Sequence, residues 1–427
     1  MELLFRNVTV LPMDDTLEER VLRNMCIGID KGKIAYFGAY EPGENAGRVV
    51  EGENLVVIPG LINAHSHIPM ILLRGSSNDV PLEEWLFEHI FPREAKLTGE
   101  DIHAGSLLGM LEAISTGTTA LCDMYMNLDA IASAAEKVGI RLHLTNALTS
   151  FDENENLEEN RSFLQNRLIR EKYRDSCLIK SLNGIHAVYT SYPRAWERVR
   201  KEAEENGKPI NVHVSETKTE QENCIEKYGT TPLQTLDRYG VLDVGCIAAH
   251  CVYLTDEDIE LMREKNVTAV HCPTSNLMLA SGIADVSKYI KRGVNVALGT
   301  DGAASNNSLD MFEEMKLASL LQKGISLDPT AISAYDALKM ATVNGAKALR
   351  LNSGVIKEGC NADLAVLDFS RIGLTPCYDH VANVVYSANG SDVAMTVIDG
   401  KIVYEYGRFA CGIDIGKLRK AVEDGKK

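Results

Sequence analysis

The chain has 427 residues, of which 44 are Lys or Arg and 60 are Asp or Glu, giving a formal net charge of −16. This length exceeds what one hydrophobic core usually fills, so we expect one large domain with a smaller satellite. The negative charge argues against nucleic-acid or anionic-membrane binding, because phosphate groups would repel the surface, and the 45% apolar composition excludes a disordered chain.

No segment of the sequence has the character of a membrane span or a secretory signal. The two longest stretches without charged residues, 54–73 and 266–284, both contain His, Pro and Asn, which a lipid-facing helix tolerates poorly. The N-terminus lacks a basic region followed by an apolar stretch and a cleavage site, so we expect a cytoplasmic protein. Ten cysteines without a CxxC pair are typical of reduced, mostly buried thiols.

Both ends of the chain have the pattern of short β-strands without helices. Residues 1–58 alternate apolar and polar positions around an Asp-Lys-Gly turn at 30–32. Residues 360–427 repeat this pattern around an Asp-Gly turn at 399–400. We therefore predict that 1–58 plus 360–427 form one composite β-sandwich domain.

The middle of the chain, residues 59–359, alternates short β-rich runs with helical patterns such as 195–206 and 256–265. Eight such runs predict the α/β class and a closed (β/α)8 TIM barrel, with an open doubly wound sheet as the alternative. In such a barrel the catalytic groups lie at the carboxyl ends of the strands. The runs are 56–67, 118–124, 141–148, 177–188, 209–216, 245–254, 267–275 and 295–302.

Side chains that can bind a metal stand at the ends of four of these runs. His65 and His67 are two residues apart, so the period of a strand points both imidazoles to the same side, the barrel interior. His213, His250 and Asp301 end three further runs. An isolated HxH pair is more often two hydrogen-bonded histidines, but this set around one cavity predicts a divalent metal site. Imidazole and carboxylate ligands favour Zn²⁺, with Fe²⁺ or Mn²⁺ left open.

Glu216 is the nearest candidate for proton transfer, because a metal-activated water needs an acid or base beside it. It follows His213 by three residues, so the chain must bend to turn its carboxyl inward; otherwise Glu216 is a solvated loop acid. His250 can orient the water and relay its proton. Lys180 begins its run, which favours one metal ion over two bridged by a carboxylated lysine. We expect His271 to serve in structural hydrogen bonding.

Several motifs together resemble the amidohydrolase superfamily over essentially the whole chain. They are PGLINAHSH (59–67), HVSE (213–216), the strand-end His250 and GTDG (299–302). The segment WLFEHIFPREAKLT (85–98), with NGIHAVYT and HVSET, is similar to the 5′-deoxyadenosine, methylthioadenosine and S-adenosylhomocysteine deaminases. The HxE and PCxxC signature of the other zinc deaminases does not occur.

This resemblance implies a zinc-dependent hydrolytic deaminase. It would convert 5′-deoxyadenosine, methylthioadenosine, S-adenosylhomocysteine and adenosine to the inosine analogues plus ammonia. The resemblance implies that Glu216 protonates the purine N1 and that Asp301 with His250 handles the water proton. The implied zinc ligands are His65, His67, His213 and Asp301.

The same resemblance implies further substrate contacts in addition to those of Glu216 and Asp301. Glu94 would bind the ribose 2′ and 3′ hydroxyls, His186 would contact the purine, and Trp85 would wall the pocket by stacking. The structural alternatives are that Trp85 anchors a helix in the core and that Glu94 belongs to an exposed charged cluster with its neighbours.

The loop after the third barrel run bears on the 5′ group of the substrate. It reads FDENENLEENR (151–161), with five acidic residues before its single basic residue, Arg161. The resemblance implies that a homocysteine carboxylate would need a cation at this loop. The local field disfavours a carboxylate unless Arg161 reaches inward, so we expect a preference for neutral 5′ groups.

Two other functions stay open on the sequence alone. Another amidohydrolase, such as a guanine or s-triazine deaminase or chlorohydrolase, would keep the metal site without needing Glu94. A non-catalytic scaffold of the same fold would typically lose metal ligands, and this chain retains each expected group. We expect a homo-oligomer, a dimer or tetramer, whose ligand is a small nucleoside and neither nucleic acid nor membrane.

Overall fold

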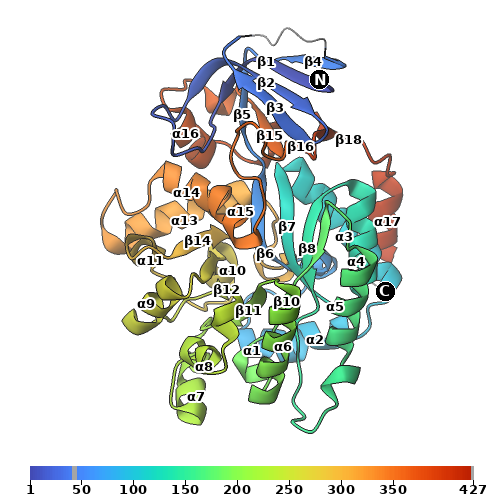
Figure 1. The fold of residues 1–427 in the computed structure, drawn as a ribbon, viewed down its shortest axis with the longest axis vertical. Helices are drawn as coiled ribbons and strands as arrows, with labels where there is room; N and C mark the ends of the chain where they lie inside the picture. Colours follow the sequence, from blue (N-terminus) through green and yellow to red (C-terminus); the bar gives the residue numbers. More distant parts are fainter. Residues whose placement is uncertain (41–45, 425–427) are drawn as a thin grey trace.

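Strands from both ends of the chain form one sheet in the computed structural model, which describes residues 1–40 and 46–424 (Figure 1). Its order is β18-β17-β16-β15-β5-β1-β2-β3, with β4 beside β1. The antiparallel pair β5 and β15 joins the two ends, with Pro59 opposite Leu364. The strands are β1 (Leu3–Val10), β2 (Leu22–Asp30), β3 (Lys33–Gly38), β4 (Arg48–Glu51), β5 (Leu55–Pro59), β15 (Leu364–Asp368), β16 (Val393–Ile398), β17 (Lys401–Glu405) and β18 (Arg408–Phe409).

Two hairpins of this sheet turn where the sequence predicts turns. Lys31 and Gly32 both have positive φ angles, 48° and 74°, between β2 and β3. Asp399 and Gly400 have φ angles of 51° and 77° between β16 and β17. Positive φ at both loop residues matches the right-handed twist of the flanking strands, and glycine adopts it without steric cost. Both predicted turns are confirmed.

The expectation that the C-terminal part contains only strands is wrong. The short helix α16 (His380–Ala382) and the longer α17 (Ile415–Asp424) both lie within 360–427. Leu418 and Val422 stand four residues apart on α17, so they share one face, and both are buried. Leu418 packs in the core cluster that contains residues of α3, which explains why this segment is helical.

The sandwich arrangement and the boundaries of the two domains, at 58/59 and 359/360, stay predictions. The predicted ranges also contain residues 41–45 and 425–427, which lie outside the described residues.

Nine short parallel strands close into a barrel below this sheet (Figure 1), and they occupy eight positions because only one residue separates β9 from β10. One arc is β6-β7-β8-β9 and the other is β10-β11-β12-β13-β14. A parallel bridge between Leu148 and Ile185 connects the arcs on one side, and a bridge between Ser66 and Asp301 closes the other. The barrel is therefore confirmed over the open sheet. Its strands are β6 (Leu61–Ser66), β7 (Thr118–Met124), β8 (Arg141–Thr145), β9 (Ile179–Ser181), β10 (Asn183–Gly184), β11 (Ile210–Val214), β12 (Cys246–His250), β13 (Thr268–His271) and β14 (Asn295–Leu298).

Helices surround the barrel, and the two helical patterns named from the sequence correspond to α6 and α9. Of the helices in residues 1–40 and 46–424, none combines the length and apolar character needed to cross a bilayer. The remaining elements are η1 (Ile68–Leu73), α1 (Leu82–Glu84), η2 (Trp85–Ile90), α2 (Phe91–Glu94), α3 (Gly99–Ser115), α4 (Leu128–Val138), η3 (Leu157–Glu159), α5 (Arg161–Lys172), η4 (Val188–Thr190), α6 (Pro193–Asn206), α7 (Lys218–Tyr228), α8 (Pro232–Arg238), η5 (Val241–Val244), α9 (Asp256–Glu264), α10 (Pro273–Met278), α11 (Val286–Lys291), α12 (Ala303–Asn306), α13 (Met311–Ser326), α14 (Ala334–Met340), α15 (Val343–Leu349), η6 (Ile372–Leu374), η7 (Asn383–Ser387) and η8 (Gly390–Asp392).

Candidate active site

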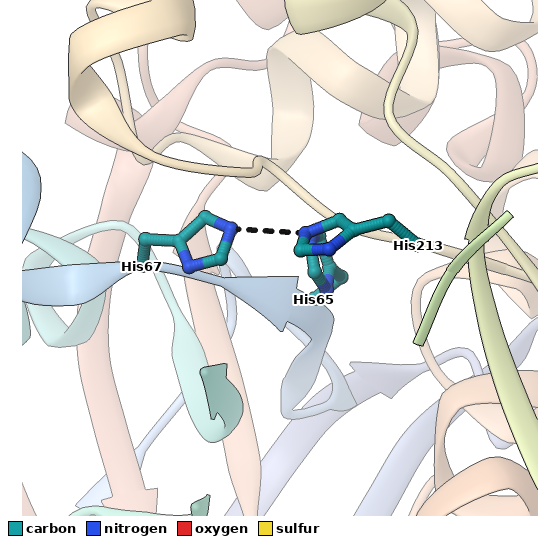
Figure 2. Close-up of side chains that lie close together, drawn as sticks. All are labelled: His65, His67 and His213. Carbon is teal, nitrogen blue, oxygen red and sulfur yellow. Dashed lines mark hydrogen bonds between the residues drawn. The ribbon is translucent and has the colours of Figure 1, made fainter. Parts of the chain in front are cut away.

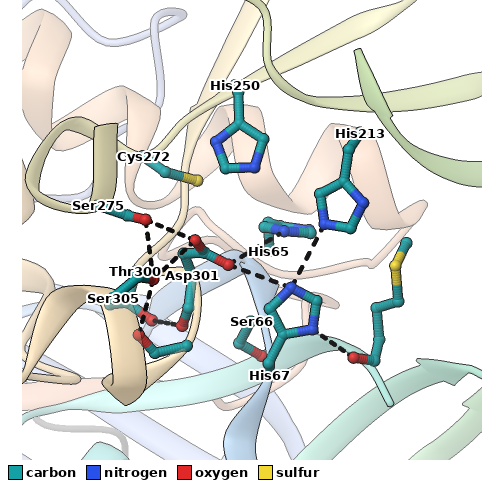
Figure 3. A network of polar contacts seen from close by, with 12 residues as sticks. His65, Ser66, His67, His213, His250, Cys272, Ser275, Thr300, Asp301 and Ser305 are labelled. Atoms are coloured by element: carbon teal, nitrogen blue, oxygen red, sulfur yellow. Dashed lines mark hydrogen bonds and ion pairs between the residues drawn. The ribbon is translucent and has the colours of Figure 1, made fainter. Parts of the chain in front are cut away.

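The predicted metal ligands meet at the carboxyl ends of β6, β11, β12 and β14. His67 Nε2 is 3.4 Å from His213 Nε2 and 3.1 Å from Asp301 Oδ1 (Figures 2 and 3). His65 Nε2 lies 3.6 Å from the same Asp301 oxygen. His250 faces this group from the end of β12, and one nitrogen atom of its ring lies within 4.8 Å of a ligand atom of His65 and of Asp301. The structure thus brings the five side chains to one point.

The donor atoms fit a divalent metal. Both ring nitrogens of His65 are buried and find no hydrogen-bond partner in the described part of the chain, an arrangement that is costly unless a ligand satisfies it. One ligand atom each from His65, His67 and His213 lies within 4.8 Å of the others. The Nδ1 atoms of His67 and His213 contact the carbonyls of Met124 and His186, which leaves both Nε2 atoms for a cation. Nitrogen and carboxylate donors of this kind suit Zn²⁺ and related ions.

Backbone bends at the strand ends turn these side chains inward. Ser215, His250 and Asp301 have φ angles of 51°, 69° and 61°, in the left-handed region that non-glycine residues rarely adopt. Such conformations cost about 1–3 kcal/mol each and concentrate at functional sites. The bend at Ser215 is the one that the HVSE spacing requires, because it brings Glu216 back toward the cavity. At Gly299 a Cβ would stand 2.7 Å from the His65 carbonyl oxygen, so only glycine allows this approach.

Burial and neighbouring charges shift the pKa values of the proposed metal ligands in different directions. Burial lowers the pKa of His65 to about 4 and the pKa of His213 well below its usual range. For His67 burial also disfavours the charged form, but the contact with Asp301 outweighs it and raises the pKa of His67 to about 9. Burial disfavours the charged form of Asp301 as well, yet both imidazole contacts hold the pKa of Asp301 well below its usual range. The contact between His67 and Asp301 thus favours the charged forms of both groups, an ion pair that a bound metal would replace because ligation requires neutral imidazole.

The Glu216 carboxyl is buried and faces His250. Its Oε1 accepts a hydrogen bond from Ser281 Oγ (2.9 Å), and its Oε2 is 3.7 Å from His250 Nε2. The Glu216 backbone N–H donates to Glu220 Oε2 at 2.7 Å, which fixes the bend. Burial raises the pKa of Glu216 even though the His250 charge opposes this. The carboxyl therefore holds a proton more readily than an exposed glutamate, which suits a general acid.

The segment 272–281 contacts three of these groups, and sequence reasoning missed it. Ser275 Oγ donates to Asp301 Oδ2 (2.6 Å), as Figure 3 shows. Asn276 Oδ1 lies 2.9 Å from His250 Nδ1, so this nitrogen carries the proton and Nε2 can accept one. Ser281 supplies the donor to Glu216. Hydroxyl and amide residues that follow a barrel strand were the available signal.

We expect Ser281→Ala to lower kcat/KM about tenfold for the reaction in which Glu216 transfers a proton, because a hydrogen bond to a charged group contributes about 1.5–3 kcal/mol. The Ser281 hydroxyl stabilises the ionised carboxylate, so its loss raises the pKa of Glu216 further. The limb of the pH–rate profile that reports Glu216 should therefore move toward alkaline pH. Ser319→Ala, which removes a buried hydroxyl bonded to the Ile332 carbonyl, is the control. An unmoved limb would contradict this positioning role.

A pocket of about 390 Å³ opens from this cluster. Trp85 on η2, Glu94 on α2 and His186 before η4 all line it. Trp85 and Glu94 are 5% and 7% exposed, so Glu94 is not part of an exposed charged cluster. Within residues 1–40 and 46–424, Trp85 Nε1 is buried without a hydrogen-bond partner. Burial raises the pKa of Glu94, and the neighbouring Tyr125 hydroxyl opposes this rise. Tyr125 was missed from the sequence, although it directly follows β7 at the same barrel end.

Two sequence arguments need correction. The acidic loop 151–161 is not part of the pocket wall, and its Arg161 hydrogen-bonds Asn127 instead of reaching inward. His271 makes no side-chain hydrogen bond to any described residue: both ring nitrogens are buried without a partner, and burial lowers the pKa of His271 to about 3. The direction of a loop and the neighbours of a buried strand residue depend on packing that the local pattern does not encode.

Comparison with known proteins places this geometry in a family. Residues 56–403 match the model of the amidohydrolase family. The chain is 48% identical over 385 residues to a 5-methylthioadenosine/S-adenosylhomocysteine deaminase of Thermococcus sibiricus, covering 88% of this chain and 89% of the relative. It is 42% identical over 430 residues to a 5′-deoxyadenosine deaminase of Methanosarcina mazei, covering 100% and 97%. A zinc-bound adenosine deaminase structure from Xanthomonas campestris superposes with TM-score 0.94 at 33% identity, covering 100% and 98%.

Proposed function

Because this chain belongs to the amidohydrolase family, we propose that it hydrolytically deaminates 5′-deoxyadenosine and related adenosine nucleosides to inosine analogues and ammonia. The observation that carries the proposal is the buried Glu216 carboxyl beside the His/Asp cluster, inside a pocket that also presents Glu94. The deaminase names of the relatives at 42–48% identity support the same reaction.

The metal of this proposal is one Zn²⁺ ion held by His65, His67, His213 and Asp301. When bound, zinc lowers the pKa of water, so that hydroxide is available at neutral pH. The zinc-bound relative supports the choice of ion. A single ion also agrees with Lys180, which stands at the other end of the barrel on β9.

The side chains of this chain would then move the protons. Glu216 donates a proton to N1 of the purine, which makes C6 more electrophilic. In the neutral tautomer whose Nδ1 donates to Asn276, His250 Nε2 can accept the proton of the attacking water, with Asp301 as the second acceptor. A C6–O bond forms, the C6–N bond breaks, and the amino group leaves as ammonia with the proton taken from the water. The proton of the new C6 hydroxyl returns to Glu216, which restores the acid and leaves the neutral inosine product. His186 and Trp85 hold the purine, and Glu94 accepts hydrogen bonds from the ribose diol.

The test of the function is an ultraviolet assay for adenosine-to-inosine conversion on purified protein, alongside metal analysis. We expect turnover of 5′-deoxyadenosine, about one equivalent of zinc, loss of activity on dialysis against a chelator, and recovery with Zn²⁺. A free base turned over as fast as its nucleoside would favour a guanine or s-triazine type of hydrolase. No turnover of any purine by the zinc-loaded protein would refute the proposal.

The pocket wall predicts which 5′ groups are preferred. No Lys or Arg is among its lining residues in the described chain, whereas Leu82, Leu86, Phe91 and Met126 are. A homocysteine carboxylate would lose hydration here without gaining a cation. We expect kcat/KM for 5′-deoxyadenosine and methylthioadenosine to exceed that for S-adenosylhomocysteine at least about tenfold, the equivalent of one uncompensated hydrogen bond. Equal or higher values for the homocysteine conjugate would defeat this preference.

A further inference from the structure

A second cavity, of about 570 Å³, lies away from the active site at the opposite end of the barrel strands. Lys180 stands at the beginning of β9, and Lys208 directly precedes β11. Both lysines are therefore at the amino ends of strands, whereas the His/Asp cluster is at the carboxyl ends. The lining residues are Arg167, Arg170, Glu171, Tyr173, Arg174, Lys180, Ser181, Asn206 and Lys208.

This cavity is strongly positive in a protein whose net charge is −16. Five of its lining side chains are cations, and one is a carboxylate. Arg170 pairs with Glu202 (2.9 Å), and Arg167 pairs with Glu158 (2.7 Å). Within residues 1–40 and 46–424, the other three cations, Arg174, Lys180 and Lys208, form no ion pair. The cavity thus holds an uncompensated positive charge.

The positive charge of the cavity contributes to the lowered pKa values of two neighbouring groups. Burial and the charges of Lys180, Arg350 and Arg170 lower the pKa of Lys208. Burial, followed by the charges of Lys208, Arg141 and Lys180, lowers the pKa of His143 to about 3. The carbonyl ends of α5 and α6 lie nearby and attract cations. Burial is the largest cause of the lowered pKa of Lys208, and repulsion from Lys180, Arg350 and Arg170 adds to it.

An anion would relieve this repulsion. Among the described residues, Arg170 Nε is buried and has no hydrogen-bond partner, so a residue of the cavity wall carries an unused donor. Oxygen atoms of a phosphate accept charge-assisted hydrogen bonds from guanidinium and ammonium groups. We propose that this cavity binds a phosphate group, as inorganic phosphate or as the phosphomonoester of a nucleotide, through Arg174, Lys180 and Lys208. This site is independent of the proposed deaminase reaction.

Isothermal titration calorimetry on the zinc-loaded protein tests the site, with inorganic phosphate and uridine monophosphate as probes at constant ionic strength. We expect saturable binding that weakens about tenfold or more in Lys180→Met/Lys208→Met, because the double variant loses two charge-assisted contacts to the phosphate. Lys137→Met/Lys316→Met is the matched control, because both lysines are exposed, and it should bind like the wild type. Uridine, which lacks the phosphate, should not compete. Tighter binding of the nucleotide than of phosphate identifies the phosphomonoester as the source.

A second measurement needs no variant. Inorganic phosphate should protect Lys180 and Lys208 of the wild-type protein from a lysine-acylating reagent, while Lys137 and Lys316 react equally with and without it. For each lysine, peptide mass spectrometry measures the extent of acylation with phosphate relative to that without phosphate. Absence of saturable binding, equal affinity in the double variant, or equal protection of all four lysines would overturn the proposal.

Discussion

Glu216→Gln lowers kcat/KM for 5′-deoxyadenosine about 10²–10⁴-fold, the usual contribution of general acid–base catalysis. Gln has nearly the same shape, and its amide oxygen can still accept the hydrogen bond from Ser281. It cannot donate an acidic proton to the purine N1. Because Glu216 is not among the proposed metal ligands, the variant should keep its zinc.

Steady-state kinetics with metal analysis of the same preparation separates these effects. Glu226→Gln is the control, since Glu226 is exposed on α7 and its substitution makes the same change in charge. We expect the Glu226 variant to behave like the wild type. Unchanged activity in Glu216→Gln would remove the acid from the mechanism, whereas loss of zinc would mean that Glu216 holds the site together.

Arg141→Met reduces the free energy of unfolding by about 3–5 kcal/mol, because it leaves a buried carboxylate unpaired. Arg141 begins β8, and its guanidinium reaches the sheet built from the chain ends. Its Nε and Nη2 donate to Asp363 at 2.7 and 3.0 Å, and Nη2 also donates to Asp399 at 2.9 Å. The side chains of Arg141 and Asp363 are 3% and 1% exposed, so water cannot replace the lost partner.

Urea unfolding followed by circular dichroism measures this loss as a shift of the midpoint. The control is Arg292→Met, whose partner Asp256 lies 2.9 Å away on the exposed surface. Exposed pairs contribute about 0–1 kcal/mol, so the midpoint of the control should hardly move. Similar shifts in both variants would show that Arg141 does not link the barrel to the sheet.

The strand pattern predicted the barrel and the place of its polar side chains. His65, His213, His250 and Asp301 each stand at or next to the end of a short apolar run, and parallel strands bring such ends together. This reasoning needs only periodicity and chain order, which are local properties. The convergence of these four side chains and His67 could therefore be predicted from the sequence alone.

Contacts made by loops were not predictable in the same way. Ser281 reaches Glu216 across 65 positions of sequence, and its place depends on how the chain returns after α10. Tyr125 directly follows a strand, yet nothing local distinguishes it from an ordinary core tyrosine. The resemblance connected the loop 151–161 with the substrate tail, but these residues do not line the pocket.

The sheet shared by both chain ends has a consequence during synthesis on the ribosome. β5 exposes the edge that β15 later covers, and β15 leaves the exit tunnel only after the whole barrel has been translated. Contacts between such distant segments form slowly, because a long loop must close first. The nascent protein therefore carries an uncovered strand edge for most of its translation, when a chaperone that shields such edges would benefit it most.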